Sequence, residues 1–310
     1  MTLGLVGDVG GTNGRFALVD LDEVRATHTW PTATLPGLPT IAKHFDFGGV
    51  GPDFACIAVA APVSGPAVTL TNANVRLDVA SLGIRHARLA NDLEAAAAGV
   101  EDVPESLRHH VVAGARDPER PSLVVGLGTG LGVAVRLPDG QVLSGEGGHA
   151  LLAPQDAVTI ELTRCLAESL GRAVEWEDVL CGRGFGRFVA WTRGASELAV
   201  SRDFEALEQQ AASATAEPGS EAHHLFAGAV ADFIRGLAFT LRAGGVYLCG
   251  GVSGHLRQAF RLPVFRARLR ADGPVSHVLS DLPVTVLTDD RLALRGCIRL
   301  SRRWYRQSAH

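Results

Sequence analysis

A strand, a glycine turn and a second strand follow one another twice in this chain, and this repeat limits the possible folds more than any other feature. In the first copy the apolar run Leu3–Val6 leads into a glycine pair, and a strand pattern follows at Arg15–Val19. In the second copy Ser122–Leu127 and Leu131–Arg136 flank a glycine turn that carries a threonine. A dinucleotide-binding loop instead passes from strand to helix with GxGxxG spacing, and a Walker A loop needs a lysine. Two such turns, one in each half of the chain, predict that both bind the same phosphate chain, one from each side.

The first turn places two glycines, which carry no side chain, close to a carboxylate. Gly10 and Gly11 allow a sharp turn and bring backbone N–H groups close to an anion. Asp8 stands beside that anion and would repel phosphate unless a divalent cation lay between them. The pairing therefore predicts a magnesium nucleotide. An ordinary tight hairpin with a solvated Asp8 is the alternative, and the second copy of the pattern argues against it.

Length and composition predict a two-domain globular protein. The chain has 310 residues, of which 46% are hydrophobic and 20% charged. The net charge of -4 points to neither nucleic acid nor an anionic membrane surface. A polar, proline-containing segment at 115–121 suggests the boundary, with a smaller α/β domain over 1–112 and a larger one over 113–310. We expect the C-terminal helix to pack back on the smaller domain.

The lack of a recognisable targeting segment and the spacing of the cysteines both predict a cytoplasmic protein. Five widely separated cysteines fit neither a disulfide framework nor a zinc site. The N-terminus enters a strand directly rather than a signal peptide, and no uninterrupted apolar run is long enough for a bilayer. We therefore expect a cytoplasmic protein that binds no membrane.

Asn91 and Asp92 lie between a predicted strand, His86–Ala90, and a predicted helix that begins at Leu93. Asn and Asp are good helix N-caps, so capping is one interpretation. A carboxylate at the open end of a parallel sheet, where α/β proteins bind ligands, is the other. The residues alone leave both open.

Two more glycine-rich segments suggest close backbone approach to a ligand. Glu146 and His149 flank a glycine pair, and those glycines argue against a helical metal site and for polar substrate contacts. A flexible surface loop is the alternative there. Gly250-Gly251 follows the predicted strand Val246–Cys249, where backbone can approach a flat ring such as adenine, or simply turn.

Helical periodicity is clear in several parts of the second half. An amphipathic helix is predicted over Ala157–Leu170. Another starts at Glu175 and is interrupted by the segment Cys181–Gly184. A basic helix is predicted over Arg257–Leu269, and a long helix over His223–Arg242 with both its histidines on a solvated first turn.

Seven segments, in this order along nearly the whole chain, resemble the bacterial glucokinases of the hexokinase branch of the actin-like ATPase superfamily. These segments are Gly7–Asn13, Thr71-Asn72, Asn91-Asp92, Gly126–Gly132, Gly145–His149, Glu177–Gly182 and Gly250-Gly251. The resemblance implies a two-domain actin-like ATPase (ribonuclease H-like) α/β fold with a cleft between the domains. It also implies ATP-dependent phosphorylation of glucose at the 6-hydroxyl, with Mg²⁺ as the metal.

The resemblance carries roles to individual residues. Asp92 matches the catalytic base, and we expect Asp8 to be the residue nearest the metal, with water between them. Positions that hold the sugar are matched by Asn72, Asn91, Glu146, His149 and Glu177. The nucleotide contacts are matched by Gly7, Asp8, Val9, Gly10, Gly11, Thr12, Gly128 and Thr129 for phosphate and by Gly250 and Gly251 for adenosine. We expect glucose and ATP as partners, no nucleic acid, and a homodimer.

Two positions depart from the family pattern. Val75 stands where an aromatic residue is usual, and Arg183 stands where the family has proline. The alternatives are a kinase for another hexose or an amino sugar, including the ROK type, and a non-catalytic sugar-responsive or actin-like assembly protein. The ROK type carries a cysteine-rich zinc motif that this chain lacks, and a regulator would need a DNA-binding segment.

Overall fold

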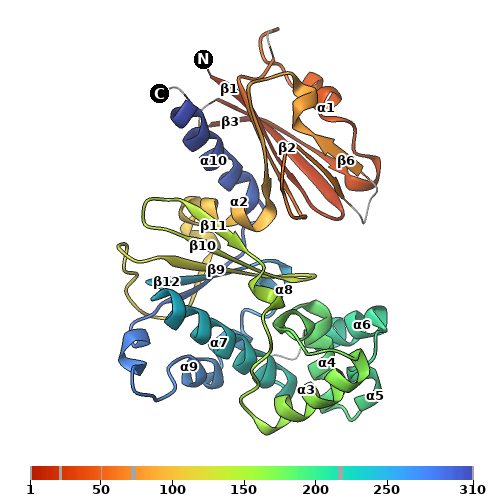
Figure 1. Ribbon diagram of the computed structural model, residues 1–310, viewed down its shortest axis with the longest axis vertical. Coiled ribbons are helices and arrows are strands. Elements are labelled where there is room, and N and C mark those ends of the chain that lie inside the picture. Colours follow the sequence, from red (N-terminus) through yellow and green to blue (C-terminus); the bar gives the residue numbers. More distant parts are fainter. Residues whose placement is uncertain (1, 21–22, 50, 71–74, 216–218, 309–310) are drawn as a thin grey trace. The chain divides into compact units, whose positions relative to one another are not determined.

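The chain forms two compact α/β units, each with its own sheet and core. The computed structural model describes residues 2–20, 23–49, 51–70, 75–215 and 219–308 (Figure 1). Unit 1 comprises Met1–Val103, Gly140–Ser144 and Asp289–His310, and unit 2 comprises Pro104–Asp139 and Gly145–Thr288. The domain division at 112 and 113 stays a prediction about where independently folding parts meet.

The five-stranded sheet of unit 1 places the first glycine turn beside a buried central strand. Its order is β3 (Glu23–Pro31), β2 (Asn13–Asp20), β1 (Leu3–Val9), β4 (Phe54–Val59) and β7 (His86–Asn91). β1 runs antiparallel to β2 and parallel to β4, which runs parallel to β7. Every residue of β4 is buried, as its unbroken apolar run predicts for a strand covered on both faces.

Both faces of this sheet are covered. On one face α2 (Asp92–Gly99) packs against α10 (Leu292–Ser308), and their apolar side chains form a core with Val6 and Cys56. Gly296 lies so close to the Ala95 carbonyl that no side chain fits between them. On the other face Ile41 of α1 (Leu38–His44) packs with Ile57 and with β5 (Ala67–Leu70) and β6 (Val75–Asp78).

The sheet of unit 2 repeats this plan around the second glycine turn. Five of its strands follow the order β10 (Leu131–Arg136), β9 (Ser122–Leu127), β12 (Gly245–Cys249), β13 (Val284–Leu287) and β8 (Arg108–Val112). β9 runs antiparallel to β10 and parallel to β12, as β1 does to β2 and β4. β11 (Val142–Gly145) lies where the chain returns to unit 2.

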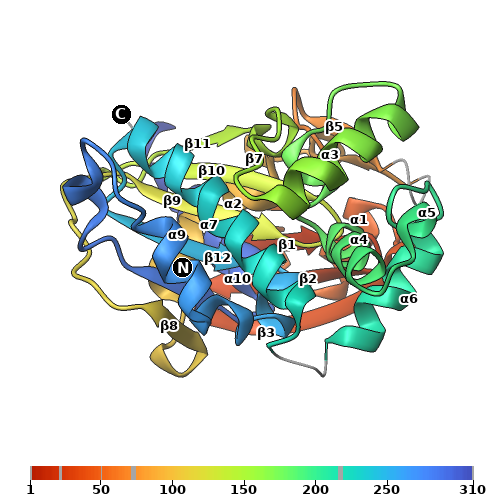
Figure 2. The same cartoon turned by 90° about the horizontal axis from the view of Figure 1, so that it is seen from below.

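The helix α7 (Glu221–Leu241) is the centre of the unit 2 core, where Phe226, Phe233 and Ile234 are buried. It lies beside α9 (Pro263–Leu269) in both views of the molecule (Figures 1 and 2). By length and composition α7 could also cross a membrane, a test that the core helix of a globular protein passes as well.

The remaining helices are α3 (Ala157–Leu170), α4 (Gly182–Thr192), α5 (Ser196–Ala199), α6 (Phe204–Ala214) and α8 (Gly251–His255).

Three helix predictions were wrong in part. His223 is buried and its ring contacts Phe185 edge-on, whereas only His224 is exposed. The glycines at 182 and 184 do not interrupt a helix but begin α4, because Gly184 packs directly on the Val179 backbone. The predicted helix at 257–269 is confined to α9, which begins after Leu262.

Candidate active site

The first glycine turn, Gly10–Thr12, is a fixed loop with an open outer side. The Gly10 N–H donates to the Asn13 carbonyl at 3.0 Å, and the hydroxyl of Thr32 donates to the Gly10 carbonyl at 2.8 Å. The Thr32 N–H donates to the Thr12 carbonyl at 2.8 Å. Among the described residues, no atom lies within 4 Å of the place where a side chain on Gly11 would begin. Backbone here can therefore meet a ligand without moving.

Asp8, near the end of β1, lies in a cluster of charged groups within unit 1. The pKa of Asp8 is raised to about 6, mainly because the carboxyl is buried; the nearby carboxylates of Asp92 and Asp290 contribute to this rise, whereas Arg15 opposes it. Arg15 faces Asp8 across the β1–β2 pair, and its guanidinium also donates to the Asp290 carbonyl at 3.0 Å. The surroundings of an ionised Asp8 therefore have a shortage of positive charge, with one guanidinium near three carboxylates.

A bound divalent cation would balance the excess negative charge around Asp8. Among the described residues, no three His, Cys, Asp or Glu side chains are grouped to hold a metal directly. Mg²⁺ usually takes one or two carboxylates and completes its shell with water and substrate phosphates. The donor set around Asp8 suits an ion held in that way rather than in a cage of protein ligands.

Asn91 and Asp92 lie where β7 ends and α2 begins, at the same edge of the sheet as Asp8. The Asn91 side chain caps α2, because its Oδ1 accepts from the N–H groups of Leu93 at 3.0 Å and Glu94 at 3.3 Å. Its Nδ2 donates to the Ala61 carbonyl at 3.3 Å. The capping interpretation is therefore right for Asn91, while Asp92 opens the helix beside Asp8.

The second glycine turn, Gly128–Gly130, is held by groups from further along the chain. The Gly182 N–H, at the start of α4, donates to the Gly128 carbonyl at 2.9 Å. The Leu131 N–H donates to Glu177 Oε2 at 2.8 Å. A Cβ on Gly130 would lie 2.6 Å from that same oxygen, so a larger residue there would push the Glu177 carboxylate away from the turn.

Three of the predicted sugar-binding residues, Glu146, His149 and Glu177, come together in unit 2. The carboxylates of Glu146 and Glu177, together with that of Glu175, all raise the pKa of the His149 imidazole. Glu175 Oε2 lies 2.8 Å from His149 Nδ1, and this hydrogen bond is the main reason that the pKa of His149 is raised. The result is an acidic cluster around one exposed imidazole.

The segment that carries Glu146 and His149 is not a flexible surface loop. Residues Gly147–His149 form one 3-10 turn. A side chain on Gly148 would strike the Leu131 carbonyl of β10, and one on Gly147 would lie 2.8 Å from Val133. Close packing on β10 therefore explains both glycines and fixes the position of His149.

Gly250 and Gly251 connect β12 to α8 at the end of β9. Gly250 has a φ of 92°, a conformation that side chains rarely adopt, and it packs directly on the Leu127 carbonyl. Gly251 is exposed. The turn is therefore one that only glycine permits, next to the strand that leads into the second glycine turn.

Known glucokinases resemble this chain over nearly its whole length. The Glucokinase family model matches residues 5–303. The chain is 35% identical to a glucokinase of Marinobacter nauticus, covering 94% of this chain and 95% of that protein. The chain is also 33% identical to a glucokinase of Pectobacterium atrosepticum, covering 94% of each protein.

The chain belongs to the glucokinase family.

Solved structures support the same assignment. A glucokinase from an Antarctic psychrotroph superposes with a TM-score of 0.80 at 25% identity, covering 98% of this chain and 99% of that one. A Balamuthia mandrillaris glucokinase, solved with glucose, gives 0.74 at 23% identity over 97% of this chain and 94% of that one, which bears on the fold alone. The predicted actin-like ATPase fold class is confirmed, and so is ATP-dependent phosphorylation of glucose as the activity.

In this member of the glucokinase family, the Arg183 departure touches the site directly. The Arg183 guanidinium donates to Glu177 Oε1 at 3.2 Å and stacks over the Phe204 ring, 4.9 Å from its centre. Both oxygens of Glu177 are thus engaged, one by Arg183 and one by the Leu131 N–H. At the other departure, Val75 is half-buried in β6.

Two residues of the site were missed by sequence reasoning. Arg15 could have been found, because the hairpin register pairs it with Asp8. Glu175 had no such signal, since its link to His149 depends on how two short turns pack together. The predicted sugar contact Asn72 lies outside the described residues.

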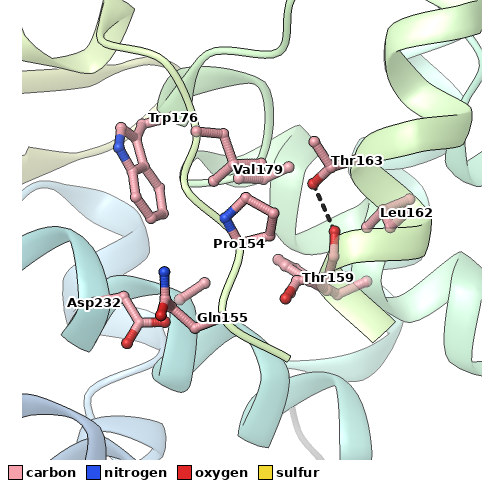
Figure 3. A pocket seen from close by; sticks show the side chains of 11 residues that line it. Pro154, Gln155, Thr159, Leu162, Thr163, Trp176, Val179 and Asp232 are labelled. Atoms are coloured by element: carbon pink, nitrogen blue, oxygen red, sulfur yellow. Dashed lines mark hydrogen bonds between the residues drawn. The ribbon is translucent and has the colours of Figure 1, made fainter. Parts of the chain in front are cut away.

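The segment that carries Glu175 and Glu177 is held in place by packing against α3 and α7. Figure 3 shows Trp176 and Val179 lining a small pocket with residues of α3, Thr159 among them. Trp176 also packs against Phe233 of α7, with ring centres 5.2 Å apart. The pocket holds about 10 Å³, room for roughly one water molecule, so it serves packing rather than ligand binding.

Proposed function

We propose that Asp92 is the general base in the phosphorylation of glucose by ATP. A sugar hydroxyl has a pKa far above neutrality, and a carboxylate beside the 6-hydroxyl can take its proton as the new O–P bond forms. The observation that carries this proposal is the pairing of Asp92 with Asp8 at one edge of the unit 1 sheet. Two carboxylates with different surroundings can divide the work between base and cation binding.

Asp8 is proposed to face Mg²⁺ through water. The shortage of positive charge around Asp8 supports this role, as does the raised pKa of its carboxyl. When bound, the ion would offset negative charge on the phosphate oxygens. The N–H groups of the first glycine turn, and of Gly7–Val9 leading into it, would orient those oxygens. Gly128 and Thr129 are proposed to do the same in unit 2, and Gly250 and Gly251 to contact adenosine.

Sugar selection is proposed to rest on Glu146, His149 and Glu177 in unit 2 and on Asn72 and Asn91 in unit 1. Carboxylates accept hydrogen bonds from hydroxyls, and a buried partner left unpaired by the wrong sugar penalises it strongly. The clustering of the three unit 2 residues supports this role. Asn91 would combine it with capping α2.

Replacement of the proposed base tests the assignment. Asp92→Asn keeps the size of the side chain and should lower kcat by on the order of 10²-fold or more, with little change in KM for glucose. A coupled ADP-release assay measures both. Asp203→Asn is the matched control, because Asp203 only caps α6 and asparagine caps equally well. Turnover by Asp92→Asn within a fewfold of wild type would rule out Asp92 as the base.

A homodimer in the cytoplasm is also proposed. Among the described residues none of the five cysteines forms a disulfide, and four of them are buried, which suits a reducing compartment. Sedimentation equilibrium tests the assembly, with an expected mass of twice the 32.6 kDa of one chain. A mass equal to one chain at micromolar concentration would contradict the dimer.

A further inference from the structure

We propose that Glu175 is a positioning residue, which fixes the tautomer and the ring orientation of His149 so that His149 Nε2 faces a sugar hydroxyl. This inference rests on the proposed function, because it takes His149 as a sugar contact. It adds a residue outside the family motifs. The observation behind it is the contact of 2.8 Å between Glu175 Oε2 and His149 Nδ1.

Glu175 is itself held firmly. Its backbone N–H donates to Asp178 Oδ2 at 2.9 Å, and its side chain accepts from the Asp178 backbone in return. Asp178 is in turn fixed by two bonds from the Arg172 guanidinium, at 2.8 and 2.9 Å. Trp176, the next residue along, is buried in the core. The carboxylate is therefore in place before any ligand arrives.

The two turns that carry the pair are also joined through their backbones. Leu151 and Glu175 form an antiparallel bridge, and the Trp176 N–H donates to the Ala150 carbonyl at 3.0 Å. His149 is half exposed, with 52% of its side chain accessible, whereas Glu175 is more buried at 29%. The imidazole is thus fixed from its inner side by Nδ1 and presents its other nitrogen outward.

The carboxylate decides which nitrogen carries the hydrogen. An ionised carboxylate only accepts hydrogen bonds, so Nδ1 must be the donor and a neutral ring keeps a lone pair on Nε2. Glu175, Glu146 and Glu177 also favour the protonated ring, in which Nε2 becomes a donor; Arg183 faces Glu177 rather than the imidazole. The hydrogen bond that Nε2 offers a sugar hydroxyl therefore changes direction when His149 titrates.

Two substitutions of Glu175 separate positioning from capping. Glu175→Ser keeps a capping hydroxyl for Asp178 but is too short to reach His149. Glu175→Gln keeps an acceptor for Nδ1–H but removes the charge. Glu197→Gln, an exposed position on α5, is the control. We expect Glu175→Ser to raise KM for glucose about tenfold, with kcat, KM for ATP and Tm nearly unchanged.

The pH profile gives a readout that a merely structural role would not move. Removing the charge in Glu175→Gln lowers the pKa of His149, so the change in KM for glucose with pH should move to lower pH. Glu197→Gln should leave the profile in place. A Glu175→Gln profile identical to that of wild type would overturn the proposal.

Nitrogen-15 NMR of the histidine side chains tests the tautomer without any turnover. We expect the neutral His149 ring of the full-length protein to carry its hydrogen on Nδ1, and Glu175→Ser to shift it toward the usual mixture. Hydrogen on Nε2 in wild type would overturn the role of Glu175 alone. An unchanged KM for glucose in His149→Ala would instead overturn the sugar contact in the proposed function, and this inference with it.

Discussion

The two glycine turns share a strand plan and differ in where their negative charge comes from. β1 and β9 each lead into a turn between an antiparallel neighbour and a parallel one. Following Gly7, β1 carries Asp8, whereas following Gly126, β9 carries the fully buried Leu127. The second turn instead receives a carboxylate from Glu177, 46 residues after the N–H group that it binds.

This difference separates two uses of a carboxylate. Glu177 is satisfied within the protein, by the Leu131 N–H and by Arg183, so it stabilises the turn that it contacts. Asp8 is buried and, besides Arg15, has two other carboxylates near it, so its ionised form destabilises its own unit. The first turn carries unbalanced charge for a ligand, and the second is balanced within the chain.

The largest effect is expected from Asp8→Asn. This substitution keeps the shape of the side chain and removes the charge that Mg²⁺ is proposed to face, so kcat should fall by on the order of 10²-fold. A steady-state assay across Mg²⁺ concentrations measures it. Leu127→Met, the volume-conserving change at the equivalent place, should keep kcat within a fewfold of wild type. Equal losses in both variants would abolish the distinction between the turns.

A smaller loss is expected from Glu177→Ala. It leaves the Leu131 N–H and Arg183 without their acceptor, which should cost about 1–3 kcal/mol in the free energy of unfolding and raise KM for glucose at least tenfold. Glu177→Gln, which can still accept from Leu131, should recover most of the stability. Urea denaturation of both variants gives the comparison, and equal stabilities would contradict the anchoring role.

The smallest effect should come from adding one methyl group to each turn. Gly130→Ala places a carbon 2.6 Å from Glu177 Oε2 and should lower Tm by several degrees, whereas Gly11→Ala meets no described atom and should leave Tm unchanged. Gly11→Ala should instead raise KM for ATP a fewfold, because the methyl group covers the open side of the turn. Calorimetry and initial rates test the pair, and a lower Tm in Gly11→Ala would contradict the open turn.

Much of the fold could be predicted from the sequence because apolar runs and glycine turns are local signals. The unbroken apolar run Phe54–Val59, typical of a central strand, is the buried β4. The helix boundary near residue 182 was wrong, because Gly184 and Gly186 serve close packing on Val179 and Leu207, which no local pattern reveals. Such contacts depend on how the chain packs in three dimensions, and the one between Gly186 and Leu207 joins residues that are distant in sequence.

The candidate site divides in the same way. Asp8 could be recognised because its carboxylate stands beside its own glycine pair. The contacts of Glu175 with His149 and of Arg183 with Glu177 could not be recognised in this way. They depend on how the turn at 147–149 packs on β10 and how the turn at 176–178 packs beside α4. Of the roles assigned by resemblance, the activity is confirmed, and the residue assignments stay predictions.

The central claim is that the first turn holds an ionised carboxylate at a cost to stability, and the pH dependence of unfolding tests it most directly. The pKa of Asp8 is about 6 in the folded protein and 3.8 in the unfolded chain. Because folding favours the protonated form, the penalty is absent below pH 3.8, grows between 3.8 and about 6, and is complete above 6.

Asp8→Asn removes that penalty. In urea denaturation with EDTA, the account predicts that Asp8→Asn is more stable than wild type by about 3 kcal/mol at pH 7.5 and that the two converge toward pH 4. A wild-type protein at least as stable as Asp8→Asn at pH 7.5, or a difference independent of pH, would contradict it.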